Sequence, residues 1–254
     1  MSQRSAAPRP SGDPGSRRGA DVGWLADVLP APPARVLDAG CGDGALSAWL
    51  AGLGYQVTAI DADPAAVAAA RSAGVPAVRA NLARYGDEPF DVVVMLLTLH
   101  HMHPLAAVLD RVARLLRPGG LLVLDEFAWD WADLATIRWF DDIAAILAAA
   151  GVADPSAGPL APADPPGGAD LASRWRVRHT EHGRPCNRGE AMIAEVAARF
   201  ADVNVRRVPY LARHLVDQRA HPQVYAALSR IEREHIADGT LLAIGFHLTA
   251  RGKP

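Results

Sequence analysis

Residues Arg35–Asp61 read RVLDAGCGDGALSAWLAGLGYQVTAID, and they combine an apolar strand, a turn with three glycines, a helix and a second strand that ends in an acid. Glycines let the backbone of a turn approach a ligand closely, and an acid about 20 residues further on can bind both hydroxyls of a ribose. This order of elements predicts a nucleoside cofactor. A cofactor-dependent enzyme is therefore the first hypothesis.

The spacing inside the turn distinguishes between cofactors. Asp38, Gly40, Gly42 and Gly44 follow the pattern D-x-G-x-G-x-G, whereas the dinucleotide fingerprint is G-x-G-x-x-G. A carboxylate before the first glycine would repel a pyrophosphate, but it suits a cofactor that carries an ammonium group and a sulfonium group. Because Ala45 allows the pattern G-x-G-x-x-A from Gly40, an NAD-dependent oxidoreductase is kept as an alternative.

The motifs that follow resemble, in the same order, those of the class I S-adenosylmethionine (SAM) dependent methyltransferases. VLDAGCGDG (36–44) is similar to the first motif of that family, and Asp61 is similar to its ribose-binding acid. FDVVVMLLTLHHM (90–102) resembles the fourth-strand motif, and LLRPGGLLVLDEF (115–127) resembles the turn from a helix into the fifth strand. The resemblance covers residues 22–127 well and residues 203–251 more loosely.

The resemblance implies an α/β fold: a doubly wound, seven-stranded, mostly parallel sheet with helices on both faces and a helical lid insertion after the fifth strand. In that family the last strand lies antiparallel beside the fifth. The residues themselves show strand and helix alternating five times, which predicts a parallel sheet with right-handed crossovers. We expect strands at 36–37, 57–60, 75–82, 90–97 and 121–124, and helices at 45–53, 64–73 and 104–116.

Four segments are expected along the chain. Residues 1–20 hold few apolar side chains and predict a disordered tail, and residues 21–128 form the SAM-binding core. Residues 129–200 form a lid and acceptor-binding insertion, with one long amphipathic helix over 129–150, a proline-rich loop over 151–170 and a helix over 188–200. Residues 201–254 supply a helix over 222–236 and the last two strands, at 203–208 and 241–248.

The resemblance implies that nine residues contact the cofactor: Asp38, Gly40, Gly42, Gly44, Asp61, Ala62, Asn81, Leu82 and Leu97. In this assignment the glycines allow close backbone approach and Asp38 faces the methionine end. Asp61 binds the ribose hydroxyls, while Ala62, Asn81 and Leu82 surround the adenine. The alternative interpretations are an ordinary tight turn for the glycines and a turn-capping role for Asp38.

Two histidines are candidates for a general base. Methyl transfer from a sulfonium is an in-line displacement with a neutral leaving group, so it needs proximity, a dry pocket and, for some acceptors, a base. His101 follows the fourth strand, where open α/β sheets place ligands, and His182 lies in an arginine-rich segment after the lid. The alternatives are a packing role for His101 and a solvated loop for His182. Neither the cluster of His100, His101 and His103 nor the cluster of His179, His182 and Cys186 has a full ligand set at zinc-binding spacing, so we expect no metal.

Composition limits the partners. The formal net charge is −2, which gives no basic field for a polyanion and argues against a nucleic-acid partner. Two cysteines are too few for a disulfide scaffold, and no apolar run approaches the roughly 18–20 residues that cross a bilayer. We therefore expect a cytoplasmic protein that does not enter membranes and that acts on a small molecule.

The expected function is transfer of a methyl group from SAM to an oxygen or nitrogen atom of a small organic molecule, with bacterial specialised metabolism as the setting that the composition suggests. The arginines between residues 174 and 188 keep an RNA or protein methyltransferase as one alternative. A second alternative is a non-catalytic SAM-binding regulator, because the acceptor side carries no decisive catalytic signature.

Replacement of Asp61 by alanine is expected to weaken SAM binding at least about tenfold, because a hydrogen bond to a charged group contributes roughly 1.5–3 kcal/mol. Isothermal titration calorimetry measures this change. An unchanged affinity would remove Asp61 from the ribose site.

Overall fold

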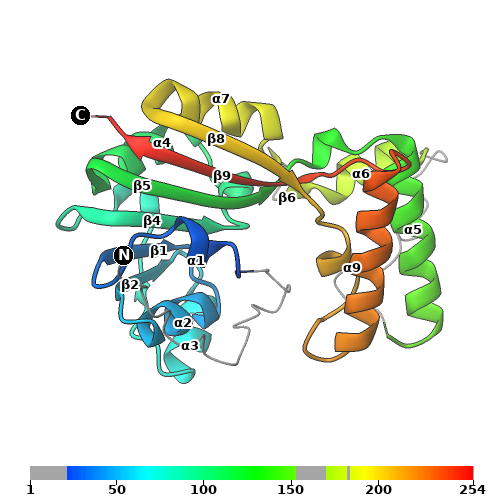
Figure 1. Cartoon of the computed structure of the whole chain (residues 1–254), viewed down its shortest axis with the longest axis horizontal. Helices are drawn as coiled ribbons and strands as arrows, with labels where there is room; N and C mark the ends of the chain where they lie inside the picture. The colour runs from blue at the N-terminus through cyan, green and yellow to red at the C-terminus, as the bar shows by residue number, and fades with distance from the viewer. Residues whose placement is uncertain (1–21, 153–169, 182–183, 254) are drawn as a thin grey trace, which may run out of the picture.

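The chain folds around one seven-stranded sheet. The computed structural model describes residues 22–152, 170–181 and 184–253. The strand order is β3-β2-β1-β4-β5-β9-β8 (Figure 1). Every neighbouring pair is parallel except the two pairs made by β9, which is antiparallel to both β5 and β8. This arrangement confirms the predicted mostly parallel α/β sheet, including the antiparallel last strand beside the fifth.

The strands of the sheet follow the apolar runs of the sequence. They are β1 (Arg35–Ala39), β2 (Gln56–Asp61), β3 (Val78–Arg79), β4 (Phe90–Leu96), β5 (Leu116–Phe127), β8 (Phe200–Val208) and β9 (Gly245–Gly252). Most of β4 and the second half of β5 are buried, as expected for central strands covered on both faces.

Helices cover both faces of the sheet, and alternate side chains of β4 show which helices cover which face. Val92 and Val94 pack with α1 (Leu25–Val28) and α2 (Ala45–Gly52). Val93 and Met95 pack with α4 (Leu105–Leu115) and α7 (Gly189–Arg199) on the opposite face. On the α2 side, α3 (Pro64–Ser72) covers β2. Asp63 accepts a hydrogen bond from the amide of Ala65 and so caps α3, which begins at the residue predicted from the sequence.

A helical lobe lies at one end of the sheet (Figure 1). It contains α5 (Leu134–Ala149), α6 (Leu171–Arg178), α8 (Ala212–Leu215), α9 (Pro222–Ala237) and the short hairpin of β6 (Thr180–Glu181) and β7 (Arg184–Pro185). Its apolar core includes Phe140, Trp175, Leu215 and Leu228. The lobe therefore combines the insertion after β5 with helices from the connection between β8 and β9.

Two predicted elements are shorter than expected because a side chain caps a helix early. Asp133 accepts a hydrogen bond from the amide of Thr136 at 2.8 Å, so the helix predicted over 129–150 divides into a 3₁₀ turn, η3 (Trp129–Trp131), and α5. Asn81 accepts from the amide of Ala83 at 2.9 Å and starts η1 (Leu82–Arg84), which shortens the strand predicted over 75–82.

The strand limits that differ most from the prediction, apart from those of β3, are at β5 and β9. β5 begins at Leu116 rather than residue 121, because residues on both sides of the glycine turn pair with neighbours in the sheet. β9 begins at Gly245 rather than residue 241, and the amide of Leu242 instead donates to Thr136 of α5. The predicted disordered tail and most of the proline-rich loop lie outside the described residues. Among the helices that the structure describes, none has both the length and the apolar character needed to span a bilayer.

Glu232 connects α9 to the chain that leaves β8. Its side chain is only 1% exposed, and it accepts hydrogen bonds from the backbone amides of Tyr210, Leu211 and Ala212 at 2.7–2.8 Å. Burial raises the pKa of this carboxyl, and the three amides oppose that rise. One buried side chain thus satisfies three backbone donors at the start of α8.

We predict that Glu232→Ala lowers the free energy of unfolding by about 3 kcal/mol or more, because three buried donors lose their acceptor at about 1–3 kcal/mol each. Urea unfolding followed by circular dichroism measures this loss. Glu234→Ala on the exposed side of the same helix is the matched control and should change stability by less than about 0.5 kcal/mol. Equal stabilities of the two variants would contradict the role of Glu232.

Candidate active site

Two adjoining cavities lie at the carboxyl ends of β1, β2 and β4, where open α/β sheets bind their ligands. Their volumes are about 460 Å³ and about 660 Å³. Six residues line both cavities: Gly40, Asp61, Asp63, Leu97, Thr98 and His101. Because they share these walls, the two cavities form one cleft, which we call the main cleft.

The three glycines of the first turn have different surroundings, although all three have a positive φ, of 86°, 55° and 81°. A β-carbon on Gly40 would lie 2.3 Å from Cγ2 of Thr98, and one on Gly44 would lie 3.0 Å from the β-carbon of Ala70. A β-carbon on Gly42 would meet nothing within 4 Å. Gly40 therefore allows the turn to pack against the end of β4, Gly44 allows α2 to pack against α3, and Gly42 has open space in front of its backbone.

Asp61 ties the turn after β1 to the turn after β2. Its Oδ2 accepts a hydrogen bond from the amide of Gly42 at 3.0 Å, and its Oδ1 accepts one from the amide of Asp63 at 2.9 Å. An ionised carboxylate has about four acceptor positions, so about two remain for a ligand. Asp61 therefore shapes the main cleft and can still bind a pair of hydroxyl groups.

Asp38 lies beneath the turn and is 2% exposed. The hydroxyl of Ser47 donates a hydrogen bond to it at 2.6 Å, which joins the end of β1 to α2. Burial raises the pKa of Asp38 to about 6, and the hydrogen bond from Ser47 opposes the rise. Asp38 also lines the larger cavity, so its structural contact and a contact with a ligand are compatible.

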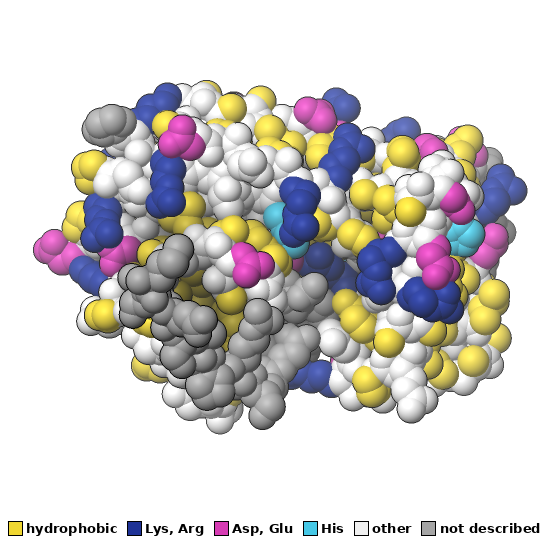
Figure 2. All heavy atoms as spheres, viewed as in Figure 1, with side chains coloured by type: hydrophobic (Ala, Val, Ile, Leu, Met, Phe, Trp, Pro, Cys, Tyr) yellow, Lys and Arg dark blue, Asp and Glu magenta, His cyan; other side chains and the backbone are white. Residues whose placement is uncertain are grey.

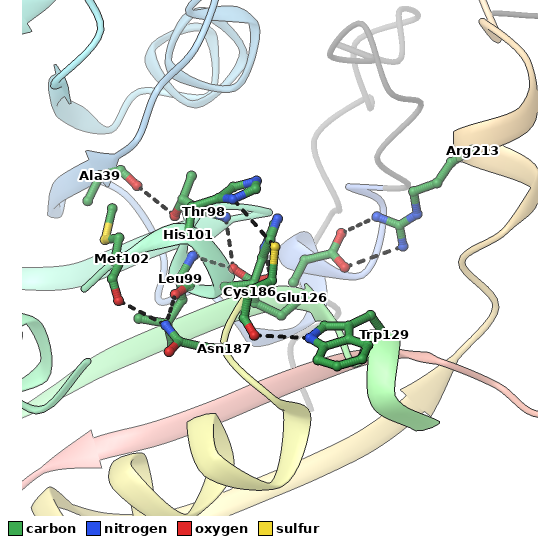
Figure 3. Close-up of polar contacts among 12 residues, drawn as sticks. Ala39, Thr98, Leu99, His101, Met102, Glu126, Trp129, Cys186, Asn187 and Arg213 are labelled. Carbon is green, nitrogen blue, oxygen red and sulfur yellow. Dashed lines mark hydrogen bonds and ion pairs between the residues drawn. The ribbon is translucent and has the colours of Figure 1, made fainter. Parts of the chain in front are cut away.

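Glu126 organises the loop after β4 from a fully buried position. Its Oε1 accepts from the amides of Thr98 and Leu99, and its Oε2 lies 2.6 Å from Nδ1 of His100 (Figure 3). Because a carboxylate can only accept, Nδ1 of His100 is the donor in this contact. The sequence places Glu126 at the rim of the sheet, but its three partners become visible only in the structure.

The backbone of the same loop is strained at Leu97, which has a φ of 53° without being glycine. Its amide donates to the carbonyl of Asp125 in β5 at 2.8 Å, and its side chain lines both cavities. Strained residues persist where the surrounding structure holds them, and they are concentrated at functional sites. Glu126 supports this strained backbone, because it accepts a hydrogen bond from the amide of the next residue, Thr98.

The insertion closes the wall behind this loop. The side-chain amide of Asn187 donates to the carbonyls of Leu99 and Met102 at 2.9 and 2.8 Å (Figure 3). Sγ of Cys186 lies 3.7 Å from Nδ1 of His101. These contacts hold the start of α7 against the 3₁₀ turn η2 (Leu99–His101), and the sequence pattern gives no signal for them.

The structure brings together eight of the nine predicted cofactor residues on the walls of the main cleft: Asp38, Gly40, Gly42, Asp61, Ala62, Asn81, Leu82 and Leu97. Gly44 instead stands at the start of α2 and packs against α3. The exposed ring of His101 lines both cavities and lies against the ring of His100, with 3.9 Å between ring centroids. His182 lies outside the described residues.

Comparison with known sequences identifies the part of the chain that carries this cleft. Residues 37–124 match a family model described as a methyltransferase domain. A ubiquinone biosynthesis O-methyltransferase from Xylella fastidiosa (strain 9a5c) is 38% identical over 109 residues, which are 39% of this chain and 44% of that protein. The chain thus spans less than half the length of the curated ubiquinone biosynthesis O-methyltransferases that it matches.

Solved structures extend the similarity over most of the chain. A SAM-dependent methyltransferase from Mesorhizobium loti has a TM-score of 0.54 at 19% identity, with 91% of this chain and 98% of that chain covered. A 1,6-didemethyltoxoflavin-N1-methyltransferase from Burkholderia thailandensis, solved with 1,6-didemethyltoxoflavin and S-adenosylhomocysteine, has a TM-score of 0.50 at 21% identity, with 92% and 75% covered. At these identities the two structures establish the fold.

We predict that Glu126→Ala weakens binding of S-adenosylhomocysteine at least about tenfold, because the loop that lines both cavities loses its shared acceptor. Calorimetry gives the affinity, and urea unfolding shows whether the variant is folded at the assay temperature. Glu126→Gln keeps an acceptor for the two amides and should retain most of the affinity. A folded Glu126→Ala variant with the affinity of the wild type would show that Glu126 does not position this loop for the ligand.

Proposed function

We propose that this chain is a class I SAM-dependent methyltransferase that transfers the methyl group of SAM to an oxygen or nitrogen atom of a small organic molecule. The observation that carries the proposal is the main cleft, in which Gly42, Asp61 and Leu97 meet at the carboxyl ends of β1, β2 and β4. The Xylella fastidiosa relative is an O-methyltransferase by name, which favours oxygen as the methylated atom.

The walls of the main cleft fit SAM. The open space in front of Gly42 admits a ligand close to the backbone, and the remaining acceptor positions of Asp61 suit the two ribose hydroxyls. Asn81 and Leu82, on the smaller cavity, would flank the adenine, and Asp38 would face the ammonium group. When bound, SAM supplies a methyl group on a sulfonium, whose displacement releases a neutral thioether.

His101 is the candidate that receives the proton of the acceptor. Its ring lines both cavities, so Nε2 can accept a proton from an acceptor hydroxyl or amine. This role requires the tautomer in which Nδ1 carries hydrogen, and Sγ of Cys186, 3.7 Å away, is placed as a weak acceptor for it. His182 is the second candidate from the sequence, and the assay below tests both histidines.

The arginine-rich segment of the insertion supports a small acceptor over a polyanion. Arg174 lies 3.7 Å from Asp141, Arg188 lies 3.2 Å from Asp130, and the guanidinium of Arg178 lies over the ring of Phe140. These arginines are engaged with other residues of the insertion after β5. The positive charge of these arginines, which could attract a nucleic acid, is therefore partly neutralised within the fold.

Incubation with methyl-labelled SAM and a small-molecule extract of the source organism should produce a labelled small molecule and an equal amount of S-adenosylhomocysteine, which mass spectrometry detects together. With the acceptor found in this way, His101→Ala should lower kcat about 100-fold or more, because a general base contributes at least that factor. The KM for SAM should change far less.

His235→Ala in α9, remote from the main cleft, is the control and should leave the kinetics unchanged. Label that enters only RNA or protein would contradict the small-molecule acceptor. A folded His101→Ala variant with the full kcat would assign the base elsewhere, and the same measurement on His182→Ala then tests the second candidate.

A further inference from the structure

A third cavity lies on the α1 side of the sheet, between the ends of β8 and β9 and helix α9, and has a volume of about 200 Å³. Polar groups from four elements line it: Trp24 before α1, Arg206 in β8, His247 in β9, and Ser229 and Arg233 in α9. It shares none of these lining residues with the main cleft. It is therefore a separate candidate site.

The back wall of this third cavity is held by a chain of polar contacts. Arg213 donates two hydrogen bonds to Asp125, at 2.8 and 3.3 Å, and Nε2 of His247 lies 3.8 Å from the same carboxylate. The guanidinium of Arg206 lies 3.0 Å from Nδ1 of His247. Because a guanidinium can only donate, Nδ1 accepts and the ring proton lies on Nε2, toward Asp125. The ring of Trp24 stacks on His247 with 3.8 Å between centroids.

The two acids near the third cavity are already used by the protein. Asp125 is engaged by Arg213, and Glu232 accepts from three backbone amides. Their acceptor capacity is thus directed away from the cavity. Among the cationic residues of the lining, Arg213 is paired with Asp125, whereas Arg206 and Arg233 are exposed and have no carboxylate partner among the described residues.

The remaining polar groups of the lining are mainly donors. In the described part of the chain, Nε1 of Trp24 and Oγ of Ser229 are buried and have no hydrogen-bond partner. Arg233 has no carboxylate within salt-bridge distance among the described residues, and Arg206 has only the ring of His247. Buried polar groups are almost always satisfied, so two residues of the lining that each carry an unpartnered polar atom favour a ligand that accepts hydrogen bonds.

Figure 2 shows several Lys and Arg side chains near the seam between the sheet and the helical lobe, with Asp and Glu side chains also on this face. Trp24, Tyr210 and Tyr225 supply flat apolar walls inside the cavity. Since drug-sized ligands occupy pockets of about 300 Å³ or more, a cavity of about 200 Å³ suits a smaller molecule.

We propose that the third cavity binds the anionic oxygens of a small aromatic molecule, a carboxylate or a phosphate, through Arg206, Arg233, Ser229 and Trp24. The anion receives charge-assisted hydrogen bonds from the two guanidinium groups, which suit planar or tetrahedral oxyanions better than an ammonium group does. The aromatic part lies against the walls. This site takes no part in cofactor binding and can be tested without SAM.

The test is calorimetric titration of the full chain, without SAM, with benzoate, phenyl phosphate and benzamide. Benzoate or phenyl phosphate should bind at least about tenfold more tightly than neutral benzamide, and the tighter of the two identifies the anion. Arg233→Gln and Ser229→Ala should each weaken the binding of that anion, and Arg233→Gln should weaken it at least about tenfold. A crystal structure with the same probe should place its oxygens between Arg206 and Arg233.

Arg230→Gln is the matched control, because Arg230 lies on the same helix, is exposed and is paired with Glu234 outside this cavity. Binding of both anions no tighter than benzamide up to about 10 mM would overturn the proposal. Equal losses of anion affinity in Arg230→Gln and Arg233→Gln would also overturn the proposal, since they would indicate binding to a diffuse basic surface. Binding of S-adenosylhomocysteine to the same variants is measured separately, so failure of this site leaves the proposed methyl transfer untouched.

Discussion

The hydrogen bond from the Gly42 amide to the Asp61 carboxylate is the contact on which the candidate active site depends. It joins the turn after β1 to the turn after β2, and a second bond from the same carboxylate to Asp63 fixes the start of α3. The sheet brings these two turns together because β1 and β2 are parallel and in register from Arg35 and Gln56 onward. The order of strands thus decides where a ligand can bind, and one acid decides the shape of the cleft.

The opposite wall depends on contacts between residues far apart in the sequence. Glu126 in β5 holds the loop after β4, and Asn187 at the start of α7 holds the next turn. Asp125, the neighbour of Glu126, binds Arg213 on the other face of the sheet. Because successive residues of a strand point to opposite faces, the end of β5 supports the main cleft on one side and the third cavity on the other.

The sequence predicts the parts of the fold that depend on local patterns. The glycine turn and the apolar runs predict the first four strands, and the family resemblance supplies eight of the residues that line the main cleft. Local patterns do not show that Gly44 packs against Ala70 or that Asp133 and Asn81 end the neighbouring elements early. Local patterns also do not show the contacts of Glu126. Its partners lie 26 to 28 residues away in the sequence and meet it only after β4 and β5 pair.

A crystal structure of the protein grown with S-adenosylhomocysteine tests the central assignment most directly. The ligand should occupy the main cleft, with its ribose hydroxyls on the free positions of Asp61, its amino-acid end near Gly42 and Asp38, and its adenine beside Asn81 and Leu82. An empty cleft at saturating ligand, or a ligand bound with its ribose away from Asp61, would contradict this assignment and the methyl transfer inferred from it.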